Sequence, residues 1–273
     1  MARVQAFEIH ELAGCPSVVR RLATDYLHTV GRVFRAFEPV ESLLAFALTV
    51  SKQRTIVDLC SGGTGPVVEL AEGMRRRGVE VQVVLSDLFP NHEAFTAAAA
   101  RSGVRVVGER EPIDARHVPA RLEGVRTLFD CFHHFTPADA RGILRDASER
   151  RAPILIVEAT ERSFPAVLGM LLFVPVLVLL LTPFVRPFRL WRLLLTYLVP
   201  IAVPLIVFDG IVSCLRSYTK AELRELASGL ETEGYRFHVG SLKARAGRLT
   251  YVLGCKGSLP EGIFSRDRVG AGG

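Results

Sequence analysis

The segment TIVDLCSGGTGP, residues 55–66, decides the fold of this chain. An apolar strand pattern runs into a turn that carries Gly62, Gly63 and Gly65, and residues 67–74 continue with helical character. Glycines let the backbone turn tightly and approach a ligand, whose polar groups are then met by amide N–H groups at a helix N-terminus. The segment therefore predicts a nucleotide-type cofactor site between a strand and a helix.

A second apolar run, residues 81–85, leads into an acidic residue, Asp87. Asp87 follows Gly65 by 22 residues, close to the spacing of roughly 20 residues at which an acid meets ribose hydroxyls in a βαβ unit. We therefore expect the Asp87 carboxylate to accept both ribose hydroxyls and Leu88 to line the same site. Asn91 either extends this pocket or only forms the turn in which it lies.

The glycine loop resembles motif I of the class I S-adenosylmethionine-dependent methyltransferases, in which an acid precedes alternating glycines. Asp58 is that acid here, whereas Cys60 and Thr64 occupy positions that usually hold glycine. The chain is similar to bacterial members of this superfamily that carry an apolar insert. The resemblance implies that S-adenosylmethionine is the cofactor and that Asp58 orients the loop. The cofactor-binding residues that it implies in this loop are Asp58, Cys60, Ser61, Gly62, Gly63 and Gly65.

Two further segments match the family in their order along the chain, and the resemblance covers roughly residues 55–160 and resumes at Asp209. Asp114 and Ala115 fall where the family often places an acid and a small residue beside the adenine. Phe132 falls at the end of the fourth strand, a region that faces both cofactor and acceptor in the family. The resemblance implies that Asp114 meets the adenine amino group and that Ala115 and Phe132 line the cofactor.

The segment DCFHHF, residues 130–135, supplies the candidates for catalysis. Methyl transfer requires alignment of the acceptor with the sulfonium methyl group and removal of a proton where needed. Histidine is the natural base near neutral pH, so we expect His134 or His133 to act as base or to orient the acceptor, with Asp130 as a polar partner. The alternative is that the histidine pair closes the turn or lines the cofactor. Nothing marks Cys131 as an activated nucleophile.

Short apolar runs alternate with helix-like segments, which predicts a buried parallel sheet. The predicted strands are residues 56–59, 81–85, 104–107, 127–129 and 154–157, with a terminal antiparallel pair at 235–239 and 249–254. Helical spacing over residues 17–50, divided by Pro39, predicts helices that cap the cofactor cleft or simply pack on the core. The expected fold class is α/β, a doubly wound Rossmann-like class I methyltransferase sheet with a hydrophobic helical hairpin insert.

The apolar content of the chain is concentrated in one region. Of 273 residues 49% are hydrophobic, and residues 164–181 and 193–208 contain no charge. A connector with Arg186, Arg189 and Arg192 separates these two runs. Residues 1–50 hold no apolar signal-type segment, so we expect the catalytic domain at the cytoplasmic face of a membrane. Five scattered cysteines without a CxxC pair favour reduced thiols over structural zinc or a disulfide framework, and no metal is expected.

The insert is expected to leave and rejoin the catalytic domain as a hairpin, because both of its ends join that domain. A spanning helix needs about 20 apolar residues. These runs are shorter and are interrupted by Pro175, Pro200 and Pro204. A shallow hairpin would keep the three connector arginines and Trp191 among anionic head groups. We therefore favour a monotopic or re-entrant anchor over a two-pass hairpin, a soluble cap or a homodimer surface.

Polar segments flank the insert on both sides in the chain. The substrate-binding candidates in them are Glu158, Asp209, Arg216 and Tyr218. Together they would hold the head group of an acceptor while its apolar part lies along the hairpin. The alternative is a salt bridge from Arg216 to Asp209 or Glu158 that fixes the base of the hairpin, because a charge beside apolar segments is costly unless it is paired.

The predicted organisation has five parts. These are an N-terminal helical cap (1–50), a cofactor-binding α/β core (51–163), a membrane-seeking hairpin (164–208), the C-terminal part of the core (209–257) and a flexible tail (258–273). The expected function is methyl transfer from S-adenosylmethionine to a small or lipid-like hydrophobic acceptor at the membrane surface. A net charge of +6 suits that surface, and no basic run interleaved with aromatic residues points to nucleic acid. Two alternatives stay open, namely methylation-triggered cyclisation of an isoprenoid-like substrate and a non-catalytic membrane-docked module that binds the cofactor.

Overall fold

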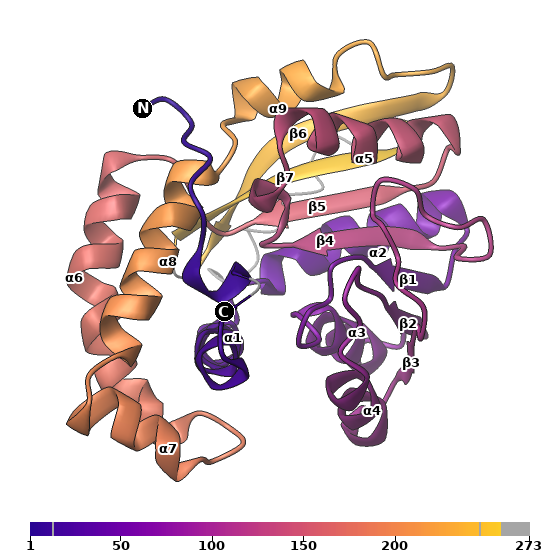
Figure 1. Cartoon of the computed structure of the whole chain (residues 1–273). Helices are drawn as coiled ribbons and strands as arrows, with labels where there is room; N and C mark the ends of the chain where they lie inside the picture. Colours follow the sequence, from indigo (N-terminus) through magenta and orange to yellow (C-terminus); the bar gives the residue numbers. More distant parts are fainter. Residues whose placement is uncertain (13, 246, 258–273) are drawn as a thin grey trace, which may run out of the picture. The chain divides into compact units, whose positions relative to one another are not determined.

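The computed structural model describes residues 1–12, 14–245 and 247–257, which fall into two compact units (Figure 1). The insert unit comprises Met1–Ala36 and Thr160–Thr219. The sheet unit comprises Phe37–Ala159 and the chain from Lys220 onward. The predicted tail, residues 258–273, lies outside the described residues.

The sheet unit is built on one seven-stranded sheet with the order β3-β2-β1-β4-β5-β7-β6. Its strands are β1 (Thr55–Asp58), β2 (Gln82–Leu85), β3 (Arg105–Gly108), β4 (Val125–Phe129), β5 (Ile154–Glu158), β6 (Tyr235–Ala244) and β7 (Gly247–Lys256). The first five strands are parallel, and β7 pairs antiparallel with both β5 and β6. This arrangement confirms the predicted fold class, including the terminal antiparallel pair.

Helices cover both faces of this sheet, which explains why every residue of β4 and β5 is buried. Figure 1 shows α5 (Pro137–Glu149) and α9 (Lys220–Ala227) together on one face, with α3 (Val67–Arg76) and α4 (His92–Arg101) on the other. Helix α2 (Glu41–Ser51) contacts α3 and the central strands. The short helix η2 (Glu38–Val40) leads into α2, so Pro39 lies between the helices Ser17–Val33 and Glu41–Ser51, as predicted.

The strand order reverses between β1 and β4, which are neighbours in the sheet. Asp58 at the end of β1 is in register with Thr127 of β4. The chain leaves β1 toward one side of the sheet and leaves β4 toward the other, and such a reversal opens a crevice at the carboxyl ends of the strands. Both the glycine loop after β1 and the helix η3 (Phe132–His134) after β4 lie at these ends.

The insert unit is helical. Its elements are η1 (Ile9–Glu11), α1 (Ser17–Val33), α6 (Phe164–Leu181), η4 (Thr182–Phe184), α7 (Leu190–Leu193), the π-helix η5 (Leu194–Leu198) and α8 (Ala202–Arg216). Leu22 and Tyr26 of α1 pack with Val178 of α6 and with Leu205 and Ile206 of α8. The N-terminal helix α1 thus belongs to the insert unit, whereas α2 belongs to the sheet unit, so residues 1–50 are divided between the two units.

The second apolar run, residues 193–208, is not one straight helix. Residues 190–198 and α8 meet at an angle of 85°. Val199 has an extended conformation, with φ of −118° and ψ of 86°, because the ring of Pro200 disfavours the helical conformation in the residue before it. The second arm of the hairpin is therefore broken near its tip.

One connector arginine is buried, contrary to the expectation that all three lie among head groups. Arg192 is 2% exposed and forms an ion pair with Asp25 of α1. Its guanidinium also donates to the carbonyl oxygens of Val185 and Pro187, at 3.1 and 2.9 Å. Burial of a guanidinium is costly unless it is paired, and the ion pair with Asp25 and the two carbonyl acceptors offset this cost, so Arg192 stabilises the tip of the insert from within. Arg186 by contrast is exposed.

Helix α6 carries the most hydrophobic surface of the insert. Together with η4 it forms the segment Phe164–Phe184, which is long and apolar enough to cross a membrane, yet only 6% of its most apolar stretch is buried. The bent pair formed by residues 190–198 and α8 passes the same test only if it is counted as one span. A core helix of a soluble domain would be mostly buried, which α6 is not.

Candidate functional site

The glycine loop has a backbone conformation that favours glycine at four positions. Gly62 and Gly65 have φ values of +51° and +56°, and the non-glycine residues Cys60 and Thr64 have φ values of +62° and +113°. Residues with a side chain are strained in this region, and a β-branched residue most of all. Cys60 and Thr64 thus keep the backbone path expected of the glycines that they replace, at the expense of local stability.

Replacing Thr64 with glycine is expected to raise the free energy of unfolding by about 1 kcal/mol. Relief of strain at φ +113° outweighs the larger backbone entropy that glycine has in the unfolded chain. The measurement is urea unfolding of the variant beside wild type. Gly62→Ala is the matched control and should lower stability by a similar amount, about 1 kcal/mol, because it introduces a side chain at positive φ. Destabilisation by Thr64→Gly would contradict this assignment of strain.

Asp58 organises the loop from below. Its carboxylate is buried and accepts hydrogen bonds from the Ser61 hydroxyl at 2.7 Å and the Thr127 hydroxyl at 2.6 Å. A Cβ built on Gly65 would lie 3.7 Å from the same carboxylate, so the loop folds closely around it. Burial raises the pKa of Asp58 to about 7, although the two hydroxyl donors oppose this shift. Asp58 thus binds the loop through Ser61, and its role in orienting the loop for a cofactor stays a prediction.

The raised pKa of Asp58 makes stability depend on pH. The folded protein retains this proton up to about pH 7, whereas the unfolded chain releases it near the ordinary value of 3.8. The folded state therefore binds more protons between these values, and its stability falls as the pH rises through this window. Between pH 5 and 8 the loss from this group is expected to be about 2–3 kcal/mol.

The test is urea unfolding at pH 5 and pH 8 for wild type and Asp58→Asn. The variant should lose less stability over this range, because it has no carboxyl group to ionise at this position. Part of the fall will remain, since burial also raises the pKa of Asp130 to about 7. An equal fall in wild type and variant would show that Asp58 does not ionise in this range.

Asp87 lies at the end of β2 and holds two backbone segments of the site together. Its two carboxylate oxygens accept from the backbone N–H groups of Gly62 at 2.8 Å and Phe89 at 2.9 Å. Each carboxylate oxygen has a second lone pair, so both can still accept a ribose hydroxyl. Leu88 and Phe89 next to it are 45% and 82% exposed, and a Cβ on Gly62 would meet nothing within 4 Å. An acidic residue beside exposed apolar side chains and an uncrowded backbone position at Gly62 suits the binding of an adenosine group.

The remaining predicted cofactor residues have different positions. Asn91 caps α4, because its side chain accepts from the backbone N–H of Ala94 at 3.1 Å. Asp114 forms an ion pair with Arg116 at 2.7 Å, and the hydrogen bond from this guanidinium holds its pKa below the ordinary value. Ala115 is buried. The carboxylate of Asp114 thus already has a cationic partner, which competes with an adenine amino group.

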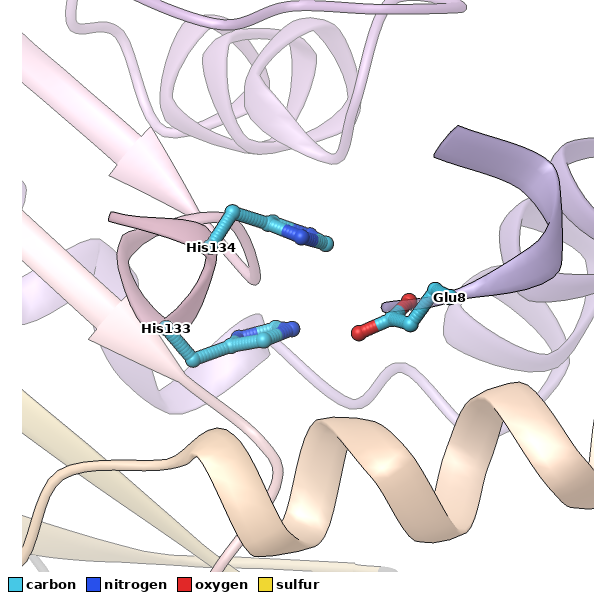
Figure 2. A group of neighbouring side chains, drawn as sticks. All are labelled: Glu8, His133 and His134. Atoms are coloured by element: carbon cyan, nitrogen blue, oxygen red, sulfur yellow. The ribbon is translucent and has the colours of Figure 1, made fainter. Parts of the chain in front are cut away.

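His133 is held by Glu158, which ends the neighbouring strand β5. The Glu158 carboxylate contacts the His133 ring at Nδ1 over 2.5 Å and accepts the backbone N–H of Phe132 at 2.7 Å. Figure 2 shows the rings of His133 and His134 projecting from η3 in the same direction, and their centroids are 4.2 Å apart. A carboxylate at Nδ1 favours the tautomer in which Nδ1 carries the proton, which leaves the basic lone pair on Nε2.

Asp130, Cys131 and Phe132 serve the local structure around this histidine pair. Asp130 has a φ of +47° and accepts the backbone N–H of Ala159 at 2.5 Å, so it ties the end of β4 to the end of β5. A hydrogen bond with the Cys60 thiol and burial raise the pKa of Cys131, which argues against a thiolate nucleophile. Phe132 is fully buried.

Asp209, Arg216 and Tyr218 lie in the insert unit and bind the N-terminal segment. Asp209 accepts the backbone N–H of Ile9 at 2.7 Å, and Arg216 forms an ion pair with Glu11 at 2.6 Å. The guanidinium of Arg3 lies 4.0 Å from the centre of the Tyr218 ring. These partners from the N-terminal segment were not anticipated from the sequence. Glu158 by contrast lies in the sheet unit.

One group of side chains in the insert unit has donor atoms close enough for a metal ion. The ligand-type atoms of Glu8, His10 and Asp209 all lie within 4.8 Å of one another. Their contacts also have a structural explanation, because the His10 ring contacts Asp209 at 2.9 Å and Glu8 accepts from Ser213 at 2.9 Å. We interpret this group as the clamp that holds the N-terminal segment against α8.

Comparisons with known proteins relate this geometry to a fold. No family model matches the sequence, and no curated protein matches it. The structure of the plantazolicin methyltransferase BpumL in complex with SAH is similar at a TM-score of 0.57, with 12% identity over 91% of this chain and 94% of BpumL. The plantazolicin methyltransferase BamL reaches 0.51, with 12% identity over 88% of this chain and 98% of its own. The chain has the class I methyltransferase fold.

Two residues of this methyltransferase fold that support the site were not anticipated from the sequence. Thr127 binds Asp58, and Arg116 binds Asp114. The signal available for Thr127 was that a polar residue stands inside the fully buried strand VRTLF. Arg116 lies only two residues from Asp114, and such a spacing alone carries no specific signal. The contact of Glu158 with His133 could not be predicted without the pairing of β4 with β5, and binding of the acceptor by Glu158 stays a prediction.

Proposed function

We propose that this protein is an enzyme that transfers a methyl group from S-adenosylmethionine to a small or lipid-like hydrophobic acceptor at the cytoplasmic face of a membrane. The observation that carries the proposal is the His133–Glu158 pair, which lies at the carboxyl ends of β4 and β5. The glycine loop and Asp87 lie at the carboxyl ends of the adjoining strands β1 and β2. A cofactor cradle and an oriented base at one edge of a sheet suit a group transfer that releases a proton.

The residues of the loop fit the proposed cofactor. Gly62 has open space where a side chain would project, and Asp87 retains acceptor capacity for ribose. Asp58 fixes the loop from within, which limits its movement when a ligand binds. When bound, S-adenosylmethionine would supply an electrophilic methyl group attached to sulfur. The protein then has to position the acceptor and to receive its proton.

His133 is the proposed base, and Glu158 is its positioning residue. The carboxylate holds Nδ1 and stabilises the imidazolium that forms when Nε2 takes a proton. A positioned base of this kind contributes about 10²–10⁴-fold to a rate. This arrangement favours an enzyme over a non-catalytic cofactor-binding module, in which no oriented base is needed. It also favours an acceptor that loses a proton, such as a hydroxyl group.

The small acceptor is supported by a structure of the same fold. BamL was solved in complex with a triazolic desmethylPZN analog and SAH. That structure holds the analog and SAH together on this fold. We extend this class of acceptor to the present chain, with the hydrophobic character inferred from the insert that follows Glu158 in the sequence.

The membrane location rests on the exposed apolar surface of the insert unit. Large apolar side chains are exposed along α6 and around the tip, among them Phe164, Leu172, Phe173, Phe184 and Phe188. Exposed apolar surface of this extent marks an interaction site, and a helix that is apolar all round but not buried in protein suits contact with lipid. Arg186 is exposed between Phe184 and Phe188, where it would meet anionic head groups.

The charge of the tip gives a separate prediction for vesicle binding. Arg186→Gln is expected to reduce partitioning onto anionic vesicles by about fivefold, since one basic residue near such a surface contributes about 1 kcal/mol. The measurement is co-sedimentation with vesicles of phosphatidylglycerol and phosphatidylcholine. Arg101→Gln, in the sheet unit, is the control and should bind as wild type. Equal losses in the two variants would indicate a general charge effect rather than contact by the tip.

The function itself is tested with detergent-solubilised protein in two steps. Calorimetric titration should show binding of S-adenosylmethionine and S-adenosylhomocysteine. Incubation with methyl-labelled cofactor and membrane extract should then move label into an organic-soluble product. Label only in water-soluble products would overturn the lipid-like acceptor, and failure of folded protein to bind either compound would overturn the methyltransferase proposal.

A further inference from the structure

The insert unit contains an apolar hollow that methyl transfer does not require. It has a volume of about 770 Å³ and lies between the N-terminal segment and α8. Its lining residues are Ile9, Leu12, Gly14, Cys15, Pro16, Val19, Ile201, Pro204, Leu205 and Phe208. None of these side chains is charged. Its volume falls in the range of roughly 300–1,000 Å³ that is typical of small-molecule sites.

The hollow continues into exposed apolar surface. Leu12, Ile201 and Phe208 line it and are themselves exposed, and the Phe7 ring lies 6.2 Å from that of Phe208. Leu198 and Val199, next to Ile201 in the chain, are also exposed. A ligand in the hollow can therefore extend along apolar surface instead of ending at a polar wall. This shape suits a long hydrocarbon chain better than a compact polar metabolite.

A fixed cation lies beside the hollow. The guanidinium of Arg20 donates to the carbonyl oxygens of His10 at 3.0 Å and Leu12 at 3.2 Å, yet the side chain is exposed. These two bonds hold it against the segment that lines one side of the hollow. A guanidinium held in this way can still bind an acidic oxygen through its remaining N–H groups.

We propose that this hollow binds one hydrocarbon chain of an anionic membrane phospholipid, with the phosphate of that lipid at Arg20. Apolar lining matches the chain, and the positive charge at the edge matches the head group. Each methylene group that leaves water contributes about fourfold to affinity, so a chain of ordinary length is retained firmly. The site is independent of methyl transfer, because it holds the lipid whether or not that lipid is the acceptor.

The test uses photo-crosslinking in lipid nanodiscs. The probe is phosphatidylglycerol with a diazirine on one acyl chain, and phosphatidylcholine with the same chain is the neutral comparison. Mass spectrometry of peptides should show saturable label on residues 9–19 and 201–208, which excess unlabelled phosphatidylglycerol removes. Label on the exposed face of α6 serves as an internal reference, because contact with bulk lipid does not saturate.

Matched variants separate the hollow from general lipid contact. Val19→Trp should fill the hollow and reduce its label several-fold relative to α6, whereas Leu27→Trp, at an exposed position of the same helix, should not. Gly14→Phe offers a second way to fill it, since a Cβ there meets nothing within 4 Å. The proposal would be overturned if neither Val19→Trp nor Gly14→Phe changed the label in the hollow, and if the label depended only on how exposed each residue is.

The charge of the head group is tested separately. Arg20→Gln should lower the preference for phosphatidylglycerol over phosphatidylcholine by about two- to fivefold, in line with a partly exposed ion pair. Arg21→Gln is the control, because Arg21 is also exposed and its guanidinium donates to Ser17. Equal label from the two lipids in wild type would overturn the role of Arg20. Label in the hollow without label on α6 would support this site and count against the membrane surface proposed above.

Discussion

Asp87→Ala is expected to weaken binding of S-adenosylmethionine by about 10²–10⁴-fold. The variant loses two hydrogen bonds from ribose hydroxyls to a charged acceptor, each worth about 1.5–3 kcal/mol. It also loses the acceptor for the backbone N–H groups of Gly62 and Phe89, so the loop that faces the cofactor is no longer held in place. Both effects act on binding, and calorimetric titration measures their sum directly.

Asp114→Ala is the matched comparison for this experiment. Asp114 already forms an ion pair with Arg116, so its removal should weaken cofactor binding by less than about tenfold. Thermal unfolding of both variants shows whether the fold is retained. A stable Asp87→Ala protein that binds the cofactor as wild type does would remove Asp87 from the site, and with it the proposed position of the ribose.

His133→Ala is expected to lower kcat by about 10²–10⁴-fold while cofactor affinity stays unchanged. The reason is that His133 is proposed to take the proton of the acceptor and to leave cofactor binding to the loop and Asp87. The measurement is label transfer to the organic-soluble product under saturating cofactor, with calorimetry on the same protein. Loss of both activity and binding would assign His133 to the cofactor site instead.

Two companion variants make this prediction specific. His134→Ala keeps the base and should lower kcat by less than about tenfold. Glu158→Gln keeps the size of the side chain but loses the negative charge at the Nδ1 atom of His133, so its pH profile should shift together with a lower kcat. A larger loss in His134→Ala than in His133→Ala would exchange the roles of the two histidines.

The fold could be predicted largely from local sequence. Each parallel strand was visible as a short apolar run, and all seven predicted strands are present, although β6 continues to Ala244 instead of ending at Val239. The glycine loop was visible from its glycines, whereas the positive φ values of Cys60 and Thr64 were found only in the structure. Helix α6 has the same bounds as the uncharged run, Phe164–Leu181. Pro175 lies inside the helix and does not end it.

The partners of the polar side chains could not be predicted in the same way. Asp58 binds Thr127, and His133 binds Glu158, across neighbouring strands that are distant in the chain. Spacing along the sequence carries no information on such contacts, since they depend on strand order and register. The same holds for Arg192, which looked like a surface cation and is buried against Asp25.

The sequence by itself determined the class of fold, the position of the cofactor loop in the chain and the presence of a long apolar insert, because these depend on periodicity, glycine and hydrophobicity over short segments. Only the tertiary structure decided that Glu158 holds His133, that the second arm of the insert is bent by 85°, and that an apolar hollow lies between α8 and the N-terminal segment. Those features arise where residues far apart in the chain come into contact. Their free energy depends on distance and burial, which the order of residues alone does not specify.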